Sequence, residues 1–162
     1  MQWDYACWVN LDYPPPSHPA STLDWIERHP LDGVNVVYGA HLYRNSGGGG
    51  PGMAHRSAGG LVNLWERADV EQALELALFR RVFADWNVPL LVTEIGAFID
   101  GDAEDRAHEL AWLDNTLSIL NDWNMGYVGW AWRSDEQLDH GMLHDGLPNE
   151  AGEVLLNAIA SE

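Results

Sequence analysis

Three short apolar stretches along the chain predict β-strands. They lie at residues 34–43, 90–95 and 126–132 and are rich in valine, isoleucine, leucine and aromatic side chains. The first is apolar without a polar alternation, which is typical of a strand buried on both faces, as in a parallel sheet.

Each apolar stretch is followed by a segment with helical spacing. Asp69, with Gln72 three residues later, has the pattern of a capping box and predicts the start of one helix. Asp102 precedes a second helix with an acidic first turn, and Asn149 begins a third. Because strand and helix alternate three times, we expect an α/β protein whose strands are parallel.

The beginning of the chain differs from the rest in composition. Residues 1–33 include the run Pro14-Pro15-Pro16, so we expect a proline-rich lead-in with one short helix over 21–27. The β/α units then occupy 34–162. We find no internal sequence repeat and predict a single domain over 1–162.

Composition limits the possible partners. The 162 residues carry a formal net charge of −17 at pH 7, and all eight basic residues are arginine. Such an acidic surface repels phosphate groups, which argues against nucleic acid and against an anionic membrane surface. No apolar run approaches the roughly 18 residues of a membrane span. Cys7 is the only cysteine, so neither a disulfide framework nor a thiolate metal site is expected.

Glu94 is the most informative single residue. It ends the second predicted strand, and strand alternation would place it on the same face as Leu90 and Val92. A carboxylate directly after an apolar run is hard to explain by packing. The carboxyl ends of parallel strands are also where α/β proteins form their active sites. We therefore expect a catalytic role for Glu94.

Polar and aromatic pairs end the other two predicted strands. His41 and Tyr43 are two residues apart and should share a face, as should Trp130 and Trp132. Each pair also has a structural interpretation, because His41 and Tyr43 could pair in the core and Trp132 could be packing. Their coincidence with Glu94 at one edge of the sheet favours a functional site.

Other candidates have simpler explanations. His140 and His144 flank a glycine-containing loop without an evident third ligand, so no metal site is expected. The glycines of 47–52 are not followed by Lys-Ser or Lys-Thr, which excludes a phosphate loop, and no cofactor motif is present. The tryptophans on predicted helices or helix ends are expected to pack: Trp25, Trp65, Trp86, Trp112 and Trp123.

Four segments follow one another in the order of a known barrel. They are 35–43 (NVVYGAHLY), 92–96 (VTEIG), 127–130 (YVGW) and 141–148 (GMLHDGLP). They resemble the sixth, seventh and eighth strands and the closing segment of the cellulase-like glycoside hydrolases, family 5 of the retaining (β/α)8 clan. The resemblance runs from about residue 34 to the end, and implies the C-terminal part of a TIM barrel, about strands 6–8.

The resemblance implies hydrolysis of the O-glycosidic bonds of a β-linked polysaccharide with retention. Glu94 would be the nucleophile, Tyr43 would hydrogen-bond to it, and His41 would bind or orient at the cleavage subsite. The expected substrate-binding residues are Trp130, Trp132 and Trp3.

The acid/base of this family has no counterpart in the sequence. In the family it is the glutamate of an Asn-Glu-Pro motif, whereas Asn149-Glu150 is followed by alanine and starts a predicted helix. A full barrel also takes about 250 residues. We therefore expect a C-terminal fragment, with the question whether Met1 is the true start left open, and negligible turnover unless an N-terminal half is supplied.

Two other functions stay open. A non-catalytic module would bind a glycan through its exposed tryptophans without cleaving it. A self-associating half-barrel would complete itself with a second copy. The cellular location is also open, because residues 1–4 do not resemble a signal peptide, whereas a parent enzyme that degrades polysaccharide would be secreted.

The acid excess without lysine generates a first prediction, that the protein works in high salt, where screening removes its self-repulsion. We expect poor refolding from urea in dilute buffer and recovery in molar salt, measured by circular dichroism. Equal refolding yields in both buffers would contradict this expectation.

Overall fold

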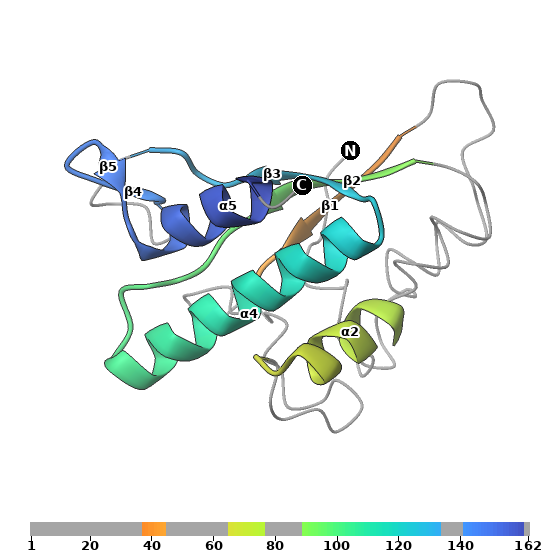
Figure 1. Cartoon of the computed structure of the whole chain (residues 1–162), viewed down its shortest axis with the longest axis horizontal. Coiled ribbons are helices and arrows are strands. Elements are labelled where there is room, and N and C mark those ends of the chain that lie inside the picture. Colours follow the sequence, from red (N-terminus) through yellow and green to blue (C-terminus); the bar gives the residue numbers. More distant parts are fainter. Residues whose placement is uncertain (1–36, 45–64, 77–88, 134–140, 161–162) are drawn as a thin grey trace, which may run out of the picture.

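The computed structural model describes residues 37–44, 65–76, 89–133 and 141–160 (Figure 1). The predicted lead-in over 1–33, with Trp3 and its short helix, lies outside the described residues. The same is true of the glycine-rich segment 47–52, of Trp86 and of His140.

The centre of the described structure is a parallel sheet of three strands. They are β1 (Tyr38–Leu42), β2 (Leu90–Ile95) and β3 (Gly126–Gly129), in the spatial order β1-β2-β3. Both pairings are parallel. The prediction of an α/β protein with parallel strands is therefore confirmed.

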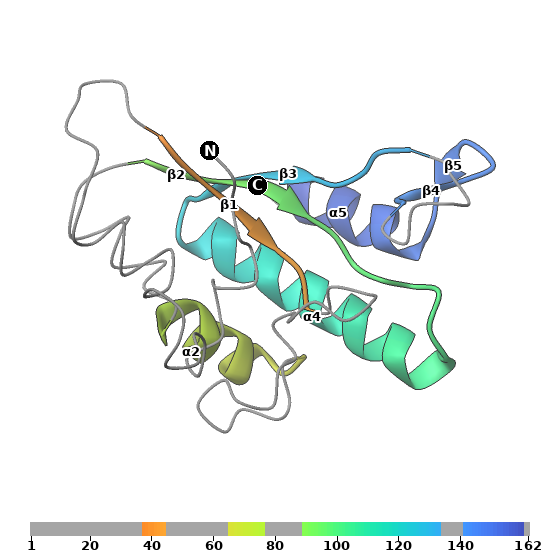
Figure 2. The same ribbon diagram turned by 180° about the vertical axis from the view of Figure 1, so that it is seen from behind.

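Three helices accompany the sheet: α2 (Arg67–Leu76), α4 (Ala103–Asp122) and α5 (Glu150–Ala160). Figures 1 and 2 show α4 and α5 on the same face of the sheet, with α2 alongside α4. Among the described helices, none covers the opposite face. The sheet is thus covered from one side within the described part of the chain.

Helix α4 begins and ends where local chemistry requires it. The Asp102 side chain accepts hydrogen bonds from the backbone N–H groups of Glu104 and Asp105, at 2.9 and 3.0 Å. This is the N-cap that the sequence predicts. After the helix, Asn124 has a φ of 53°, a left-handed conformation that asparagine tolerates and that commonly terminates helices.

The core lies between the sheet and the helices. Along α4, Leu113, Leu117 and Leu120 are buried, whereas Ala107 is exposed. Trp112 is also buried, as expected of a packing tryptophan. The main core residues are Leu42, Val70, Leu74, Leu90, Val92, Ile95, Trp112, Leu113, Leu117, Leu120, Met142 and Leu155.

The third strand is shorter than predicted. It ends at Gly129 rather than at Trp132, because the chain after it pairs with a different segment. The carbonyl of Ala131 accepts a hydrogen bond from the backbone of Met142, at 2.9 Å. A short antiparallel hairpin follows, β4 (Leu143–His144) with β5 (Leu147–Pro148).

Helix α5 approaches this segment closely at Gly152. A Cβ atom there would overlap the backbone carbonyl oxygen of Met142 and would lie 3.2 Å from Cβ of Pro148. Neither atom belongs to a flexible side-chain end. Close packing, rather than backbone freedom, therefore requires glycine at this helical position.

We predict that Gly152→Ala destabilises the fold by about 1–3 kcal/mol, the usual cost of overpacking. The sign of this change in stability is diagnostic, because replacing glycine by alanine at an open helix position would instead stabilise the protein by about 1 kcal/mol. Urea denaturation measures the difference. Glu153→Ala, at the next and exposed position of α5, serves as a control expected to change stability by less than about 0.5 kcal/mol. A Gly152→Ala variant as stable as the unchanged chain would contradict the packing.

Candidate active site

An irregularity in β2 determines where Glu94 points. In the pairing with β1, Ala40 lies opposite Val92 and the next residue, His41, lies opposite Glu94, so that Thr93 is an extra residue on β2. Val92 and Ile95 are both completely buried, although they are three positions apart, and Glu94 between them is partly exposed. The extra residue therefore reverses the alternation of faces.

This bulge corrects one prediction from the sequence. Glu94 does not share a face with Leu90 and Val92, which are both in the core. The prediction from simple alternation fails because it assumes that each residue of β2 lies opposite one residue of β1. Thr93 is an extra residue in this register, so the residues after it face the opposite side. The carboxylate consequently turns away from the core at the carboxyl end of the strand.

Tyr43 meets Glu94 at this edge of the sheet. It directly follows β1, and because its neighbour Leu42 is buried in the core, the two side chains leave the strand in opposite directions. The Tyr43 hydroxyl donates a hydrogen bond to Oε2 of Glu94, at 2.8 Å. The structure thus brings together two of the residues expected at the site.

Trp130 is attached to the end of β2 through the backbone. Its N–H donates a hydrogen bond to the carbonyl of Ile95, at 2.8 Å, so it stands beside the residue that follows Glu94. The peptide bond between Trp130 and Ala131 is cis. The side chain is 45% exposed, and Trp132, two residues on, is 49% exposed. Both indoles therefore have surface available to a ligand.

Gly96 allows these segments to approach one another. A Cβ atom at this position would overlap the carbonyl oxygen of Trp130 and lie 3.4 Å from Cε1 of Tyr43. Glycine is thus required where the chain leaves β2 between the two aromatic residues. The Val-Thr-Glu-Ile-Gly segment places the carboxylate and this small residue at the same strand end.

The remaining expected site residues are described only in part or not at all. The backbone of His41 lies opposite Glu94 in the register of β1 and β2, which places the residue at the same edge. Its side chain lies outside the described part, as does the whole of Trp3.

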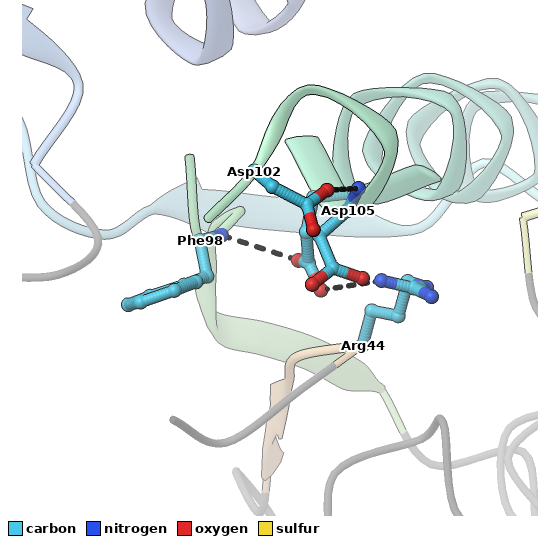
Figure 3. A network of polar contacts seen from close by, with 5 residues as sticks. Arg44, Phe98, Asp102 and Asp105 are labelled. Atoms are coloured by element: carbon cyan, nitrogen blue, oxygen red, sulfur yellow. Dashed lines mark hydrogen bonds and ion pairs between the residues drawn. The ribbon is translucent and has the colours of Figure 1, made fainter. Parts of the chain in front are cut away.

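A buried ion pair that the sequence analysis missed joins Arg44, the residue after Tyr43, to Glu109 of α4 (Figure 3). Nη1 of Arg44 donates to Oε1 of Glu109, at 2.9 Å, and the backbone N–H of Phe98 donates to Oε2 of the same carboxylate, at 3.1 Å. Arg44 is 7% exposed and Glu109 is 2% exposed. One signal in the sequence was the isolated glutamate within the apolar stripe of α4.

Burial controls the electrostatics of this ion pair. Desolvation raises the pKa of Glu109 above its ordinary value, and the Phe98 N–H and the Arg44 guanidinium oppose this shift without cancelling it. Asp105, one turn earlier on α4, raises the pKa further by charge repulsion. The desolvation of the carboxylate is thus larger in free energy than the stabilisation that Arg44 and the Phe98 N–H give to its charged form.

Aromatic rings complete the surroundings of Arg44. The guanidinium carbon lies 5.4 Å from the centroid of the Trp65 ring, a cation–π arrangement. The imidazole of His108 stacks on the same indole with 3.7 Å between ring centroids. Trp65 was expected to be a packing residue, and the structure shows that it packs on this network.

Two kinds of feature are absent from the described residues. No group of three or more histidine, cysteine, aspartate or glutamate residues in these ranges is arranged to bind a metal ion. Nor does any helix in the described part combine the length and the apolar character needed to cross a membrane.

Comparisons of the chain with protein-family models, with curated proteins and with solved structures found no match. Function must therefore be inferred from the chemistry and geometry of Glu94, Tyr43 and Trp130 at the sheet edge.

The raised pKa of Glu109 predicts a pH dependence of stability. Because the folded-state pKa lies above the unfolded one, the contribution of Glu109 to stability is fully present below the unfolded pKa and is lost as the pH rises through the folded one. Glu109→Gln removes this titration. We expect the Tm of the variant, relative to the unchanged chain, to rise as the pH increases from about 4, near the ordinary pKa of a glutamate, through the raised pKa of Glu109.

Thermal denaturation across this range measures the difference. Gln72→Ala, an exposed substitution on α2 that alters no titratable group, gives the baseline for comparison. A relative Tm of Glu109→Gln that falls with pH would contradict the assigned direction.

Proposed function

We propose that this chain is part of a retaining β-glycosidase and that Glu94 is its nucleophile. The observation that carries the proposal is the 2.8 Å hydrogen bond from Tyr43 to Glu94, at the carboxyl edge of a parallel sheet. A partly exposed carboxylate, fixed at one oxygen and turned away from the core, has the properties that a glycosidase nucleophile needs.

The arrangement of elements supports a portion of a (β/α)8 barrel as the scaffold. Three consecutive strands lie side by side in sequence order, all parallel, and α4 and α5 cover one face (Figures 1 and 2). In a barrel the helices cover only the outer face, whereas doubly wound sheets have helices on both faces. The face that no described helix covers, which Glu94 adjoins, would then be the barrel interior.

Catalysis in this proposal proceeds by double displacement. A carboxylate oxygen of Glu94 attacks the anomeric carbon, the bond to the leaving-group oxygen breaks with its electron pair, and a glycosyl ester forms on the enzyme. Water then cleaves this ester, and the sugar is released with its original configuration. The acid/base, a second carboxyl group about 5–5.5 Å away, would be supplied by the first half of the barrel.

Tyr43 and Trp130 would prepare the site for this reaction. The Tyr43 hydroxyl occupies one carboxylate oxygen and thereby fixes the orientation of the other. The exposed indole of Trp130 offers a flat apolar surface against which the C–H face of a pyranose ring can pack. A β-linked polysaccharide or oligosaccharide is the substrate class that these features favour.

A glycan-binding module without catalysis is the second candidate. It is favoured by the similar exposure of Trp130 and Trp132, which would present two apolar surfaces to one chain of sugars. This reading needs neither Glu94 nor an acid/base. Binding to insoluble cellulose or mannan that is unaffected by Glu94→Gln would support it.

The nucleophile can be tested without the acid/base. We propose reaction with a fluoro-β-cellobioside and a fluoro-β-mannobioside, each carrying fluorine beside the anomeric carbon and dinitrophenolate as the leaving group. This leaving group departs unprotonated, and the fluorine slows hydrolysis of the ester. We expect one fluorinated disaccharide per chain, attached to the peptide that contains Glu94, as measured by mass spectrometry.

Three variants make the labelling experiment specific. Glu94→Gln should abolish labelling, and Trp130→Ala should slow it by about tenfold, equivalent to about 1.4 kcal/mol of lost binding. Glu104→Gln removes another exposed carboxylate, on α4, and should label normally. Absence of label with both sugars, or a label elsewhere, would contradict the proposal.

A further inference from the structure

The ion pair between Arg44 and Glu109 joins the segments that leave β1 and β2. Arg44 is the residue after Tyr43, and Phe98 lies four residues after Glu94. Glu109 binds both segments, through Oε1 to the Arg44 guanidinium and through Oε2 to the Phe98 backbone. Figure 3 shows Arg44 and Phe98 on either side of this contact, near the beginning of α4. One carboxylate therefore links the two strand ends that carry Tyr43 and Glu94.

Stability alone does not account for this pair. Removing two charges from water costs several kcal/mol each, and buried ion pairs are often matched or exceeded in stability by apolar residues of similar volume. Burial here raises the pKa of Glu109 despite its two hydrogen-bond donors, which indicates that these donors do not fully offset the desolvation of the carboxylate. In addition, Nε of Arg44 is buried without a hydrogen-bond partner among the described residues. A costly interaction at this place calls for a role other than packing.

Geometry suggests that role. Arg44 is fixed on one side by Glu109 and on another by the Trp65 ring, which stacks on His108. Because Tyr43 is the adjacent residue, immobilising Arg44 limits the movement of the Tyr43 backbone. The binding of Phe98 similarly restrains the chain that leaves β2 after Glu94.

We propose that Arg44 and Glu109 are positioning residues, which keep the Tyr43 hydroxyl on the Glu94 carboxylate. The effect of this positioning on catalysis rests on the proposed function. The structural part of the inference is that the Tyr43–Glu94 hydrogen bond depends on a buried ion pair, and this part is independent of the proposed function.

The structural part is tested by the NMR signal of the tyrosine ring carbon that bears the hydroxyl, in protein labelled there with carbon-13. Tyr43→Phe identifies the signal, and Glu94→Gln gives its position without a carboxylate acceptor. We expect Glu109→Gln to move the Tyr43 signal most of the way to the Glu94→Gln position. A signal that stays where it is in the unchanged chain would overturn the proposal.

Controls separate positioning from general destabilisation. Asp122→Asn breaks an exposed ion pair with Arg67, between α4 and α2, and Leu117→Ala opens a cavity in the core; neither should move the signal. If Glu109→Gln does not fold, Arg44→Met combined with Glu109→Leu removes both charges while filling the space. This double variant should fold and should still displace the Tyr43 signal.

The catalytic part is tested by the kinetics of labelling with the activated fluoroglycosides. Glu109→Gln should lower the maximal labelling rate by about tenfold to a hundredfold, the scale expected of misplaced reacting groups, without changing the sugar concentration that gives half the maximal rate. In a Tyr43→Phe background the same substitution should cause no further loss, because both act through one hydrogen bond. Additive losses would overturn the positioning role.

The two experiments also separate the proposal from the function on which it rests. A Tyr43 signal that responds as expected, in a chain that no fluoroglycoside labels, would support positioning and reject the glycosidase. Labelling at Glu94 with an unresponsive signal would reject positioning and leave the glycosidase intact.

Discussion

The extra residue at Thr93 determines the direction of the Glu94 carboxylate, and the rest of the site depends on that direction. With regular alternation Glu94 would follow Val92 into the core, where an unpaired carboxylate is strongly unfavourable. The bulge instead presents the carboxylate at the strand end, within reach of the Tyr43 hydroxyl. Bulges commonly redirect side chains beside active sites in this way.

Several small contacts then bring three strand ends together. The backbone hydrogen bond from Trp130 to Ile95 places an exposed indole beside β2, and Gly96 leaves room for it. The Glu109 carboxylate restrains the segments that follow β1 and β2. The candidate site is therefore built mainly from the residues at the ends of the strands and just beyond them, on a core shared with the helices.

Much of this arrangement could be predicted from the sequence because it follows from local rules. The apolar runs located all three strands, and the Asp102 cap located the start of α4. Because parallel strand ends meet at one edge of a sheet, the sequence alone predicts that Tyr43, Glu94 and Trp130 lie at the same edge.

What the sequence missed depends on contacts between distant residues. Strand periodicity cannot reveal an extra residue such as Thr93, because the bulge exists only relative to the neighbouring strand. The Arg44–Glu109 pair spans 65 positions of the chain, and helical spacing shows only that a glutamate interrupts an apolar stripe. The early end of β3 likewise follows from the pairing of Ala131 with Met142.

The central claim is that Glu94 reacts with an anomeric carbon, and stereochemistry tests it most directly. Dinitrophenyl β-cellobioside and β-mannobioside, incubated with the chain and excess azide, require neither an acid for the leaving group nor a base for the acceptor. Proton NMR of the product distinguishes the two anomers. Double displacement through Glu94 predicts a β-glycosyl azide that is absent with Glu94→Gln. An α-glycosyl azide, or no product from either sugar, would contradict it.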